Sequence, residues 1–181
     1  SLLCPPRLRA PIVAIYHFAR TADDIADEGQ ASAEQRLHLL QSLRHDLHQH
    51  LEDPQFQSPQ WPGMLSALCV QIRAFELPLQ LLLALLDAFE QDVIYTRDQR
   101  RYADRAELLT YCSRSANPIG RLLLHLYGIT STQALAHSDA VCTALQLINF
   151  WQDISVDLPR GRFYLPSQAQ LQEEVAYARE L

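Results

Sequence analysis

Pairs of carboxylates on apolar helical segments are the feature that most limits how this chain can fold. In the segment 147–157 (LINFWQDISVD), Asn149, Asp153 and Asp157 are spaced four residues apart. Side chains at i and i+4 share a helix face, so these three polar groups point into one space. Most of the intervening residues are apolar and can pack elsewhere. Because a carboxylate pair is costly to bury unless a cation neutralises it, this face requires a positive partner.

The same spacing occurs near the start of the chain, where Asp23 and Asp27 are also four residues apart. Either pair alone could lie on a solvated helix surface, where like charges cost roughly a few tenths of a kcal/mol. Two stripes with further polar residues in phase instead favour two helices that face each other across an oxygen-rich cleft. The stripes consist of Arg20, Asp23 and Asp27 on the first helix, and of Gln146, Asn149, Asp153 and Asp157 on the second.

The composition indicates one all-α domain. Of 181 residues, 48% are hydrophobic, 20% are charged and 5 are glycine, which is typical of a globular chain with a real core. Leucine is frequent and β-branched runs are few, which favours helices. The net charge of −6 argues against a nucleic-acid-binding surface. The longest apolar run, residues 81–86, is far too short to span a bilayer, and no signal peptide is recognisable.

Apolar periodicity and capping residues predict the helices. Ser32 and Gln35 form a capping-box pattern, and Gly29 and Gly128 are typical of residues that follow a helix end. Leucines surround the segment 79–95, which predicts a central helix. The acidic residues Asp87, Glu90 and Asp92 near its end are expected on a solvated or cleft-edge face. The predicted helices cover about 7–27, 33–51, 63–75, 79–95, 105–114, 119–127 and 133–156, with a last one starting near residue 167.

The cysteines and histidines offer no alternative metal chemistry. Cys4, Cys69, Cys112 and Cys142 show no C-x-x-C spacing, and free thiols in a reducing cytosol are expected. The second helix carries four histidines without an H-E-x-x-H pattern, so a solvated polar face is favoured over metal binding. These histidines are His38, His45, His48 and His50.

The donor types in the two stripes point to magnesium and a diphosphate. Carboxylate, amide and water oxygens suit hard divalent ions, and Mg²⁺ commonly bridges to substrate phosphates. The guanidinium groups of Arg20, Arg160 and Arg162 match phosphate oxygens and are candidate diphosphate clamps. The reaction that fits is diphosphate departure, with an apolar cavity around the carbocation left behind. Lone aromatic residues such as Tyr16, Tyr111 and Phe150 are more often core than cavity lining.

Three segments closely resemble the squalene/phytoene synthase family. They are residues 16–28 (YHFARTADDIADE), 111–120 (YCSRSANPIG) and 146–166 (QLINFWQDISVDLPRGRFYLP). Within the family, SANPIGRLLLHLYG followed by NFWQD is similar to the bacterial hopanoid-pathway branch, the HpnC-type hydroxysqualene and squalene synthases. The resemblance implies an isoprenoid synthase fold, a helical bundle around a central cavity. It also implies one domain over 1–181 that is incomplete at both ends, because family members have further segments on either side.

The resemblance also implies roles for individual residues. Two aspartate-rich motifs would bind Mg²⁺ and the diphosphate, and tyrosines would line the cavity. The implied catalytic residues are Asp23, Asp27, Asp153, Asp157, Tyr16 and Tyr111. The implied substrate-binding residues are Arg20, Gln146, Asn149 and Arg162. The implied metal ligands are Asp23, Asp27, Asn149, Asp153 and Asp157.

The implied activity is the ionisation of presqualene diphosphate, formed from farnesyl diphosphate, to hydroxysqualene or squalene. Two alternatives stay open: a phytoene- or dehydrosqualene-type synthase, and a non-catalytic helical scaffold on the same fold. The implied location is cytoplasmic. The greasy substrate is compatible with peripheral contact at the inner face of the membrane without an anchor. The sequence leaves the product, the substrate chain length and the oligomeric state open.

Overall fold

The computed structural model describes residues 4–164 and residue 177. All regular secondary structure in this part of the chain is helical, which confirms the all-α prediction. The predicted helix starting near residue 167 lies outside the described residues. No helix within the described part is both long and apolar enough to cross a membrane. The elements are α1 (Pro6–Asp27), α2 (Ala33–Glu52), α3 (Pro62–Phe75), α4 (Leu79–Arg97), α5 (Arg105–Ser115), α6 (Asn117–Leu126), α7 (Thr132–Gln152), α8 (Ile154–Asp157) and the 3₁₀ helix η1 (Leu158–Arg160).

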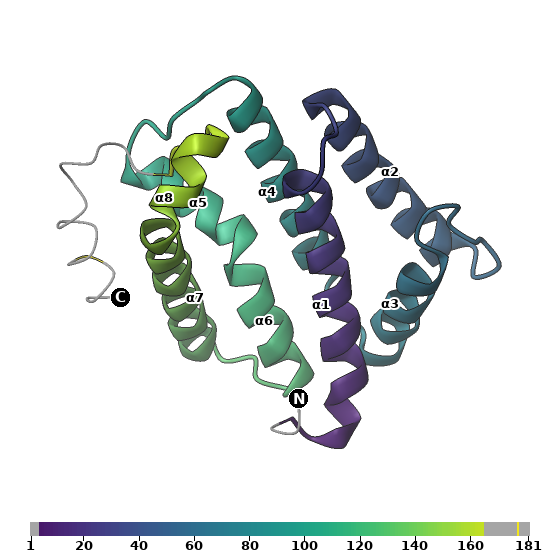
Figure 1. Cartoon of the computed structure of the whole chain (residues 1–181). Helices are drawn as coiled ribbons and strands as arrows, with labels where there is room; N and C mark the ends of the chain where they lie inside the picture. Colours follow the sequence, from purple (N-terminus) through teal and green to yellow (C-terminus); the bar gives the residue numbers. More distant parts are fainter. Residues whose placement is uncertain (1–3, 165–176, 178–181) are drawn as a thin grey trace.

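Helix α4 is the shared wall between two groups of helices, as its all-round leucines predict. It packs against α1 and α2 on one side and against α5 and α6 on the other. Helix α3 completes the first group by packing on α1 and α2, and α7 completes the second by packing on α5 and α6. Figure 1 shows the two groups as a fan, with α1 facing α6 and α7 across the middle.

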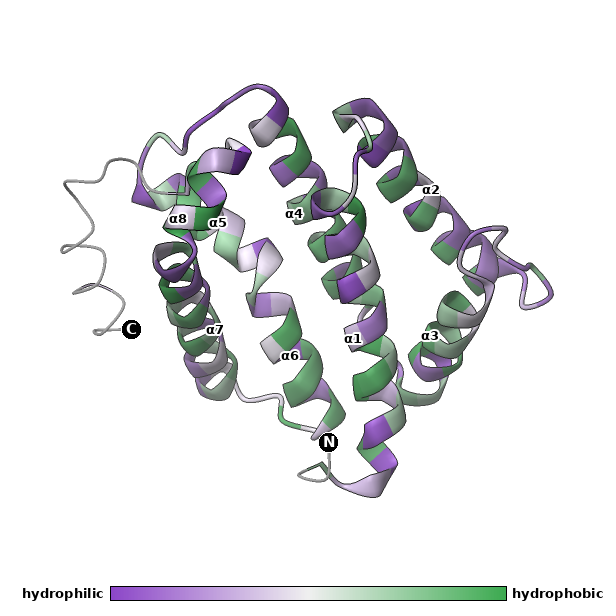
Figure 2. Ribbon diagram, viewed as in Figure 1, coloured by the Kyte–Doolittle hydropathy of each residue, from purple (hydrophilic) through white to green (hydrophobic). Residues whose placement is uncertain are grey.

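Local capping explains where the first two helices end and begin. Gly29 adopts φ 75°, a left-handed conformation that lets the chain turn directly after α1. Ser32 then caps α2: its hydroxyl accepts from the Gln35 amide, and the Gln35 side chain accepts from the Ser32 amide. The predicted capping box is therefore confirmed. In Figure 2, green and purple alternate along α2, as expected for a helix with one buried face.

The apolar residues form two cores. The larger one joins α1 to α4 and includes Phe18, Leu47 and Leu86, which are fully buried. The smaller one lies between α4, α5 and α7 and includes Tyr111, Leu147 and Phe150. Leu122 and Leu126 of α6 also belong to the larger core, so α6 connects the two groups of helices.

Two predictions about single residues need correction, those for His50 and Asp92, whereas Asp87 is exposed as expected. His50 is buried rather than solvated, because it lies at the end of α2 beneath neighbouring helices. Asp87 and Glu90 pair with Arg44 of α2, at 2.7 and 3.0 Å. Asp92, predicted with them on a solvated or cleft-edge face, instead turns into the interior cavity.

The predicted helix 133–156 is also wrong in its last part. Helix α7 ends at Gln152, and Asp153 has φ −94° and ψ 5°, outside the α-helical range. The short helix α8 follows, and Pro159, which lacks an amide hydrogen, then lies in η1. The backbone bonds from Asp153 N to Asn149 O and from Asp157 N to Asp153 O persist, at 2.9 and 2.8 Å. The helix is therefore interrupted at Asp153, but backbone hydrogen bonds still link Asn149, Asp153 and Asp157 in sequence.

Candidate active site

A polar cavity of about 580 Å³ lies between the two groups of helices. Both aspartate stripes line it: Asp23 and Asp27 from α1, and Asp153 and Asp157 from the end of α7 and from α8. The structure thus brings together residues more than 120 positions apart in the sequence. The polar residues lining this cavity are Arg20, Asp23, Asp27, Asp92, Tyr111, Ser115, Gln146, Asn149, Asp153, Asp157, Arg160, Arg162 and Tyr164. Every predicted site residue except Tyr16 is among them.

Arg162 connects the two aspartate stripes. Its guanidinium pairs with Asp27 of α1, and its Nη1 lies 3.9 Å from Asp157 Oδ1. Arg160 also approaches Asp27, at 3.7 Å. The Arg162 side chain is only 16% exposed, so these charges meet in a largely dehydrated place. Arg162, which was predicted to bind the diphosphate, therefore lines the cavity. In this structure its guanidinium pairs with carboxylates, and its binding of a diphosphate stays a prediction.

Arg20 lies at the edge of the same cavity. It pairs with Asp23 at 2.9 Å and with Asp24 at 2.7 Å, both on its own helix. Its side chain is about half exposed, so its guanidinium can exchange a carboxylate partner for a bound anion. The function of Arg20 as a diphosphate clamp stays a prediction.

Burial and mutual repulsion raise the pKa of aspartates around the cavity. The pKa of Asp23 is raised mainly by burial, against an opposing effect of Arg20. The pKa of Asp157 is raised by burial and by the neighbouring Asp153 carboxylate. Desolvated carboxylates that repel one another favour a bound cation.

The donor set fits Mg²⁺, although the ligands do not form a complete cage. Among the described residues, no three His, Cys, Asp or Glu side chains are grouped so that they could hold one metal ion. Magnesium commonly uses one or two carboxylates and completes its shell with waters and substrate phosphates. Carboxylates on opposite walls of one cavity match that requirement when a diphosphate lies between them.

Asp92 is a site residue that the sequence reasoning missed. It accepts hydrogen bonds from Tyr111 and Tyr164, and all three residues line the cavity. Burial raises its pKa to about 7. The available signal was its position on the helix predicted to be central, where a carboxylate has little access to solvent.

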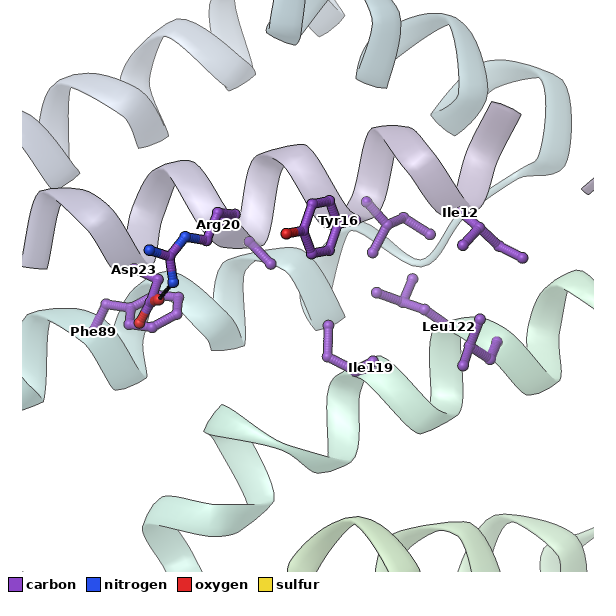
Figure 3. Close-up of a pocket in the computed structure, with 10 residues that line it drawn as sticks. Ile12, Tyr16, Arg20, Asp23, Phe89, Ile119 and Leu122 are labelled. Atoms are coloured by element: carbon purple, nitrogen blue, oxygen red, sulfur yellow. Dashed lines mark hydrogen bonds and ion pairs between the residues drawn. The ribbon is translucent and has the colours of Figure 1, made fainter. Parts of the chain in front are cut away.

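An apolar chamber of about 390 Å³ adjoins the polar cavity. Figure 3 shows Ile12 and Tyr16 of α1 opposite Ile119 and Leu122 of α6. Tyr16, which is 62% exposed, lines this chamber and not the polar cavity. The chamber and the polar cavity share three lining residues, so an apolar space and a charged space lie side by side. The shared residues are Arg20, Asp23 and Phe89.

Comparisons with known proteins identify the family of this chain. The squalene/phytoene synthase family model matches residues 1–179. The chain is 36% identical over 168 residues to a hydroxysqualene synthase of Zymomonas mobilis, covering 92% of this chain and 53% of that protein. It is 31% identical over 164 residues to a phytoene synthase of Mycobacterium tuberculosis, covering 91% and 50%.

A solved structure with the same fold is the squalene synthase HpnC from Alicyclobacillus acidocaldarius. The match has a TM-score of 0.76 and 34% identity, and it covers 96% of this chain and 61% of that one. This chain spans about half the length of the curated relatives that it matches. The family model covers nearly the whole chain, and the solved structure shares its fold. The chain therefore belongs to the squalene/phytoene synthase family.

Proposed function

We propose that this protein removes diphosphate from a prenyl diphosphate in a Mg²⁺-dependent reaction. The proposed substrate is presqualene diphosphate, formed from farnesyl diphosphate, and the proposed product is hydroxysqualene or squalene. One observation carries the proposal: a charged cavity with two aspartate stripes lies directly beside an apolar chamber, and the two share Arg20, Asp23 and Phe89 in their walls. Such a space suits a substrate with a charged head and a hydrocarbon tail.

The choice of substrate is supported by the names of similar proteins. The Zymomonas mobilis relative is called a hydroxysqualene synthase, and the Alicyclobacillus acidocaldarius structure is called a squalene synthase. The phytoene synthase of Mycobacterium tuberculosis supports a phytoene-type reaction as the second candidate. Both candidates use the same charged cavity and differ in the hydrocarbon that the apolar chamber holds.

Residues of this chain perform the binding and positioning. In the proposed reaction, Arg20 and Arg162 would bind phosphate oxygens, and carboxylates of both stripes, with Asn149, would hold Mg²⁺; all of them line the polar cavity. When bound, Mg²⁺ would neutralise the charge that develops on the leaving diphosphate. The apolar chamber would surround the hydrocarbon, with Ile12, Ile119 and Leu122 in its wall.

In the proposed reaction, Asp92 is the proton acceptor. If the product is an alcohol, a water oxygen attacks the carbocation and that water must lose one proton. Asp92 lines the polar cavity, and its raised pKa makes its carboxylate a good proton acceptor near neutral pH. Tyr111 donates to the same carboxylate and holds it in place.

The direct test is product identification. The purified protein is incubated with Mg²⁺ and either farnesyl or presqualene diphosphate, and the extracted hydrocarbon is identified by mass spectrometry. Hydroxysqualene or squalene from presqualene diphosphate supports the proposal. Turnover to a phytoene- or dehydrosqualene-type product selects the second candidate, and no turnover of either substrate favours the scaffold alternative.

The role of the aspartate stripes is tested by Asp153→Asn. Loss of one metal-facing charge is expected to lower kcat/KM at least about 100-fold at saturating Mg²⁺. Asp139→Asn is the matched control, since Asp139 also lies on α7 but pairs with Arg121 outside the cavity. Full activity of the Asp153 variant would disprove the metal site.

A further inference from the structure

A second charged pocket lies behind the polar cavity, between the α1–α2 turn and the end of α4. Its volume is about 510 Å³. We call it the arginine pocket, because Arg36, Arg97, Arg160 and Arg162 line it. Two carboxylates, Asp27 and Glu28, also line it, so arginines outnumber acids two to one in a chain whose net charge is −6. This local excess of positive charge favours a small anion.

The arginine pocket and the polar cavity share one boundary. Both are lined by Ala26, Asp27, Arg160 and Arg162. The ion pair between Arg162 and Asp27 lies at this boundary, and Arg162 Nε is buried without a hydrogen-bond partner. Arg162 therefore lines both spaces.

The backbone brings the pocket's arginines close together. Gly161 adopts φ 75°, which turns the chain directly between Arg160 and Arg162. A side chain added at Gly161 would contact Thr96 of α4 at 4.0 Å, so this turn lies close to the end of α4, next to Arg97. Arg160 is 48% exposed and holds Asp27 only loosely, at 3.7 Å. Arg97 is 40% exposed and pairs with its neighbour Asp98.

Arg36 has a different function in the same pocket. Its guanidinium donates to the carbonyl oxygens of Ile25, Gly29 and Ala31, at 2.8, 3.0 and 3.1 Å. These bonds hold the α1–α2 turn and shape the pocket. The arginines that remain available to an anion are therefore Arg97, Arg160 and, at the boundary, Arg162.

We propose that the arginine pocket is a second, metal-independent binding site for inorganic diphosphate, which receives the leaving group from the polar cavity past Arg162. This proposal rests on the proposed function, because that reaction is the source of the diphosphate. Guanidinium groups on two sides of the pocket suit an anion with two phosphate groups better than one with a single phosphate. The shared boundary gives diphosphate a route that does not pass through the apolar chamber.

The site is tested by calorimetric titration of the purified protein with inorganic diphosphate in EDTA, without Mg²⁺. We expect binding, at least about tenfold tighter than that of orthophosphate, and a loss of about tenfold in affinity for Arg97→Gln. Arg97 lines the arginine pocket and not the polar cavity. Its exposed pair with Asp98 contributes little to stability, so the variant should fold, which circular dichroism verifies.

Two matched variants separate this site from its neighbours. Arg121→Gln also removes an exposed arginine that is paired with an aspartate, but on α6, and should leave binding unchanged. Asp153→Asn alters only the polar cavity and should not weaken metal-free binding. The proposal fails if diphosphate does not bind without metal, if orthophosphate binds equally well, or if Arg97→Gln behaves like Arg121→Gln.

The route is tested by the timing of diphosphate release. In a single turnover with Mg²⁺, Arg97→Gln should slow the appearance of free diphosphate severalfold and leave the rate of hydrocarbon formation unchanged. An unchanged release rate would overturn the route. Absence of hydrocarbon formation in the unsubstituted protein would contradict the proposed function, whereas the metal-free titration still decides on the pocket itself.

Discussion

At the scale of single residues, Asp92 differs most from what its type suggests. A carboxylate on a leucine-rich helix would ordinarily turn towards solvent. Here it faces the interior, accepts from Tyr111 and Tyr164, and has a pKa raised to about 7 by burial. Burial raises the pKa of Tyr111 as well, so the phenol keeps its proton and remains a donor to Asp92. The pair therefore keeps a carboxylate in the cavity that can exchange a proton near neutral pH.

The raised pKa of Asp92 predicts a specific dependence of stability on pH. The unfolded chain has the ordinary pKa of 3.8 and the folded protein a pKa of about 7, so the folded state binds more protons between these values. The contribution of Asp92 to stability therefore falls as pH rises from about 4 to about 7. Asp92→Asn removes this ionisation and should stabilise the protein at pH 8 by about 1–3 kcal/mol relative to pH 5.

Urea denaturation of both proteins at pH 5 and pH 8 measures this difference. Asp98→Asn is the control, because Asp98 lies at the end of the same helix and is exposed. Equal destabilisation of Asp92→Asn at both pH values would show that the residue acts only through its hydrogen bonds.

At the scale of helices, the contact between α6 and α7 depends on Gly120. A Cβ atom at this position would lie 2.3 Å from Ser138 Oγ and 2.6 Å from Cys142 Sγ, both on α7. Glycine is therefore needed for close approach of the two helices, since its φ lies in the ordinary range. This approach positions α7, whose last two turns carry Gln146 and Asn149 at the cavity wall.

Gly120→Ala is expected to destabilise the protein by about 1–3 kcal/mol, because the added methyl group overpacks the helix contact. In a background with Ser138→Ala and Cys142→Ala, both clashing atoms are gone. The same substitution should then be neutral or stabilising by up to about 1 kcal/mol, since alanine favours helix over glycine. Thermal denaturation of the four proteins, with glycine or alanine at position 120 in each background, measures the two changes in stability.

Gly63→Ala is the control and should not destabilise the protein, because the space around its Cβ is open. An equal loss of stability from Gly120→Ala in both backgrounds would contradict the packing argument.

At the scale of the whole molecule, the two groups of helices are joined across the cavity by Arg162. Its pairs with Asp27 and Asp157 connect α1 to α8 through charges that would otherwise repel. A magnesium ion with a diphosphate would neutralise the same carboxylates, so Arg162 and the metal are expected to act on one set of charges. Removal of the Arg162 guanidinium should therefore increase the stabilisation that bound Mg²⁺ provides.

Arg162→Gln is therefore expected to destabilise the metal-free protein by about 1–3 kcal/mol, because it leaves Asp27 with only the loose contact to Arg160, at 3.7 Å. Added Mg²⁺ should raise the melting temperature of the variant more than that of the unsubstituted protein. Arg121→Gln provides the comparison at a surface ion pair and should show no such difference. An equal response of both proteins to Mg²⁺ would mean that Arg162 and the metal do not share these carboxylates.

Much of the fold follows from local sequence signals. The capping residue Ser32 and the turn at Gly29 depend on neighbours within a few residues, so the sequence predicts them correctly. The break at Asp153 was not predicted, because no glycine or proline marks it. The exposure of His50 and Asp92 was also mispredicted, since burial on a helix depends on which other helices cover it.

For the site, helical periodicity alone determined that Asp23 and Asp27 share one face and that Asn149, Asp153 and Asp157 share another. Only the tertiary structure decided that the two faces meet, that Arg162 lies between them and that Asp92 joins them from α4. The physical reason is how far apart along the chain the interacting residues lie. Spacing along one helix is set by backbone geometry, whereas the assembly of residues from four helices depends on how two separate cores pack around a shared wall.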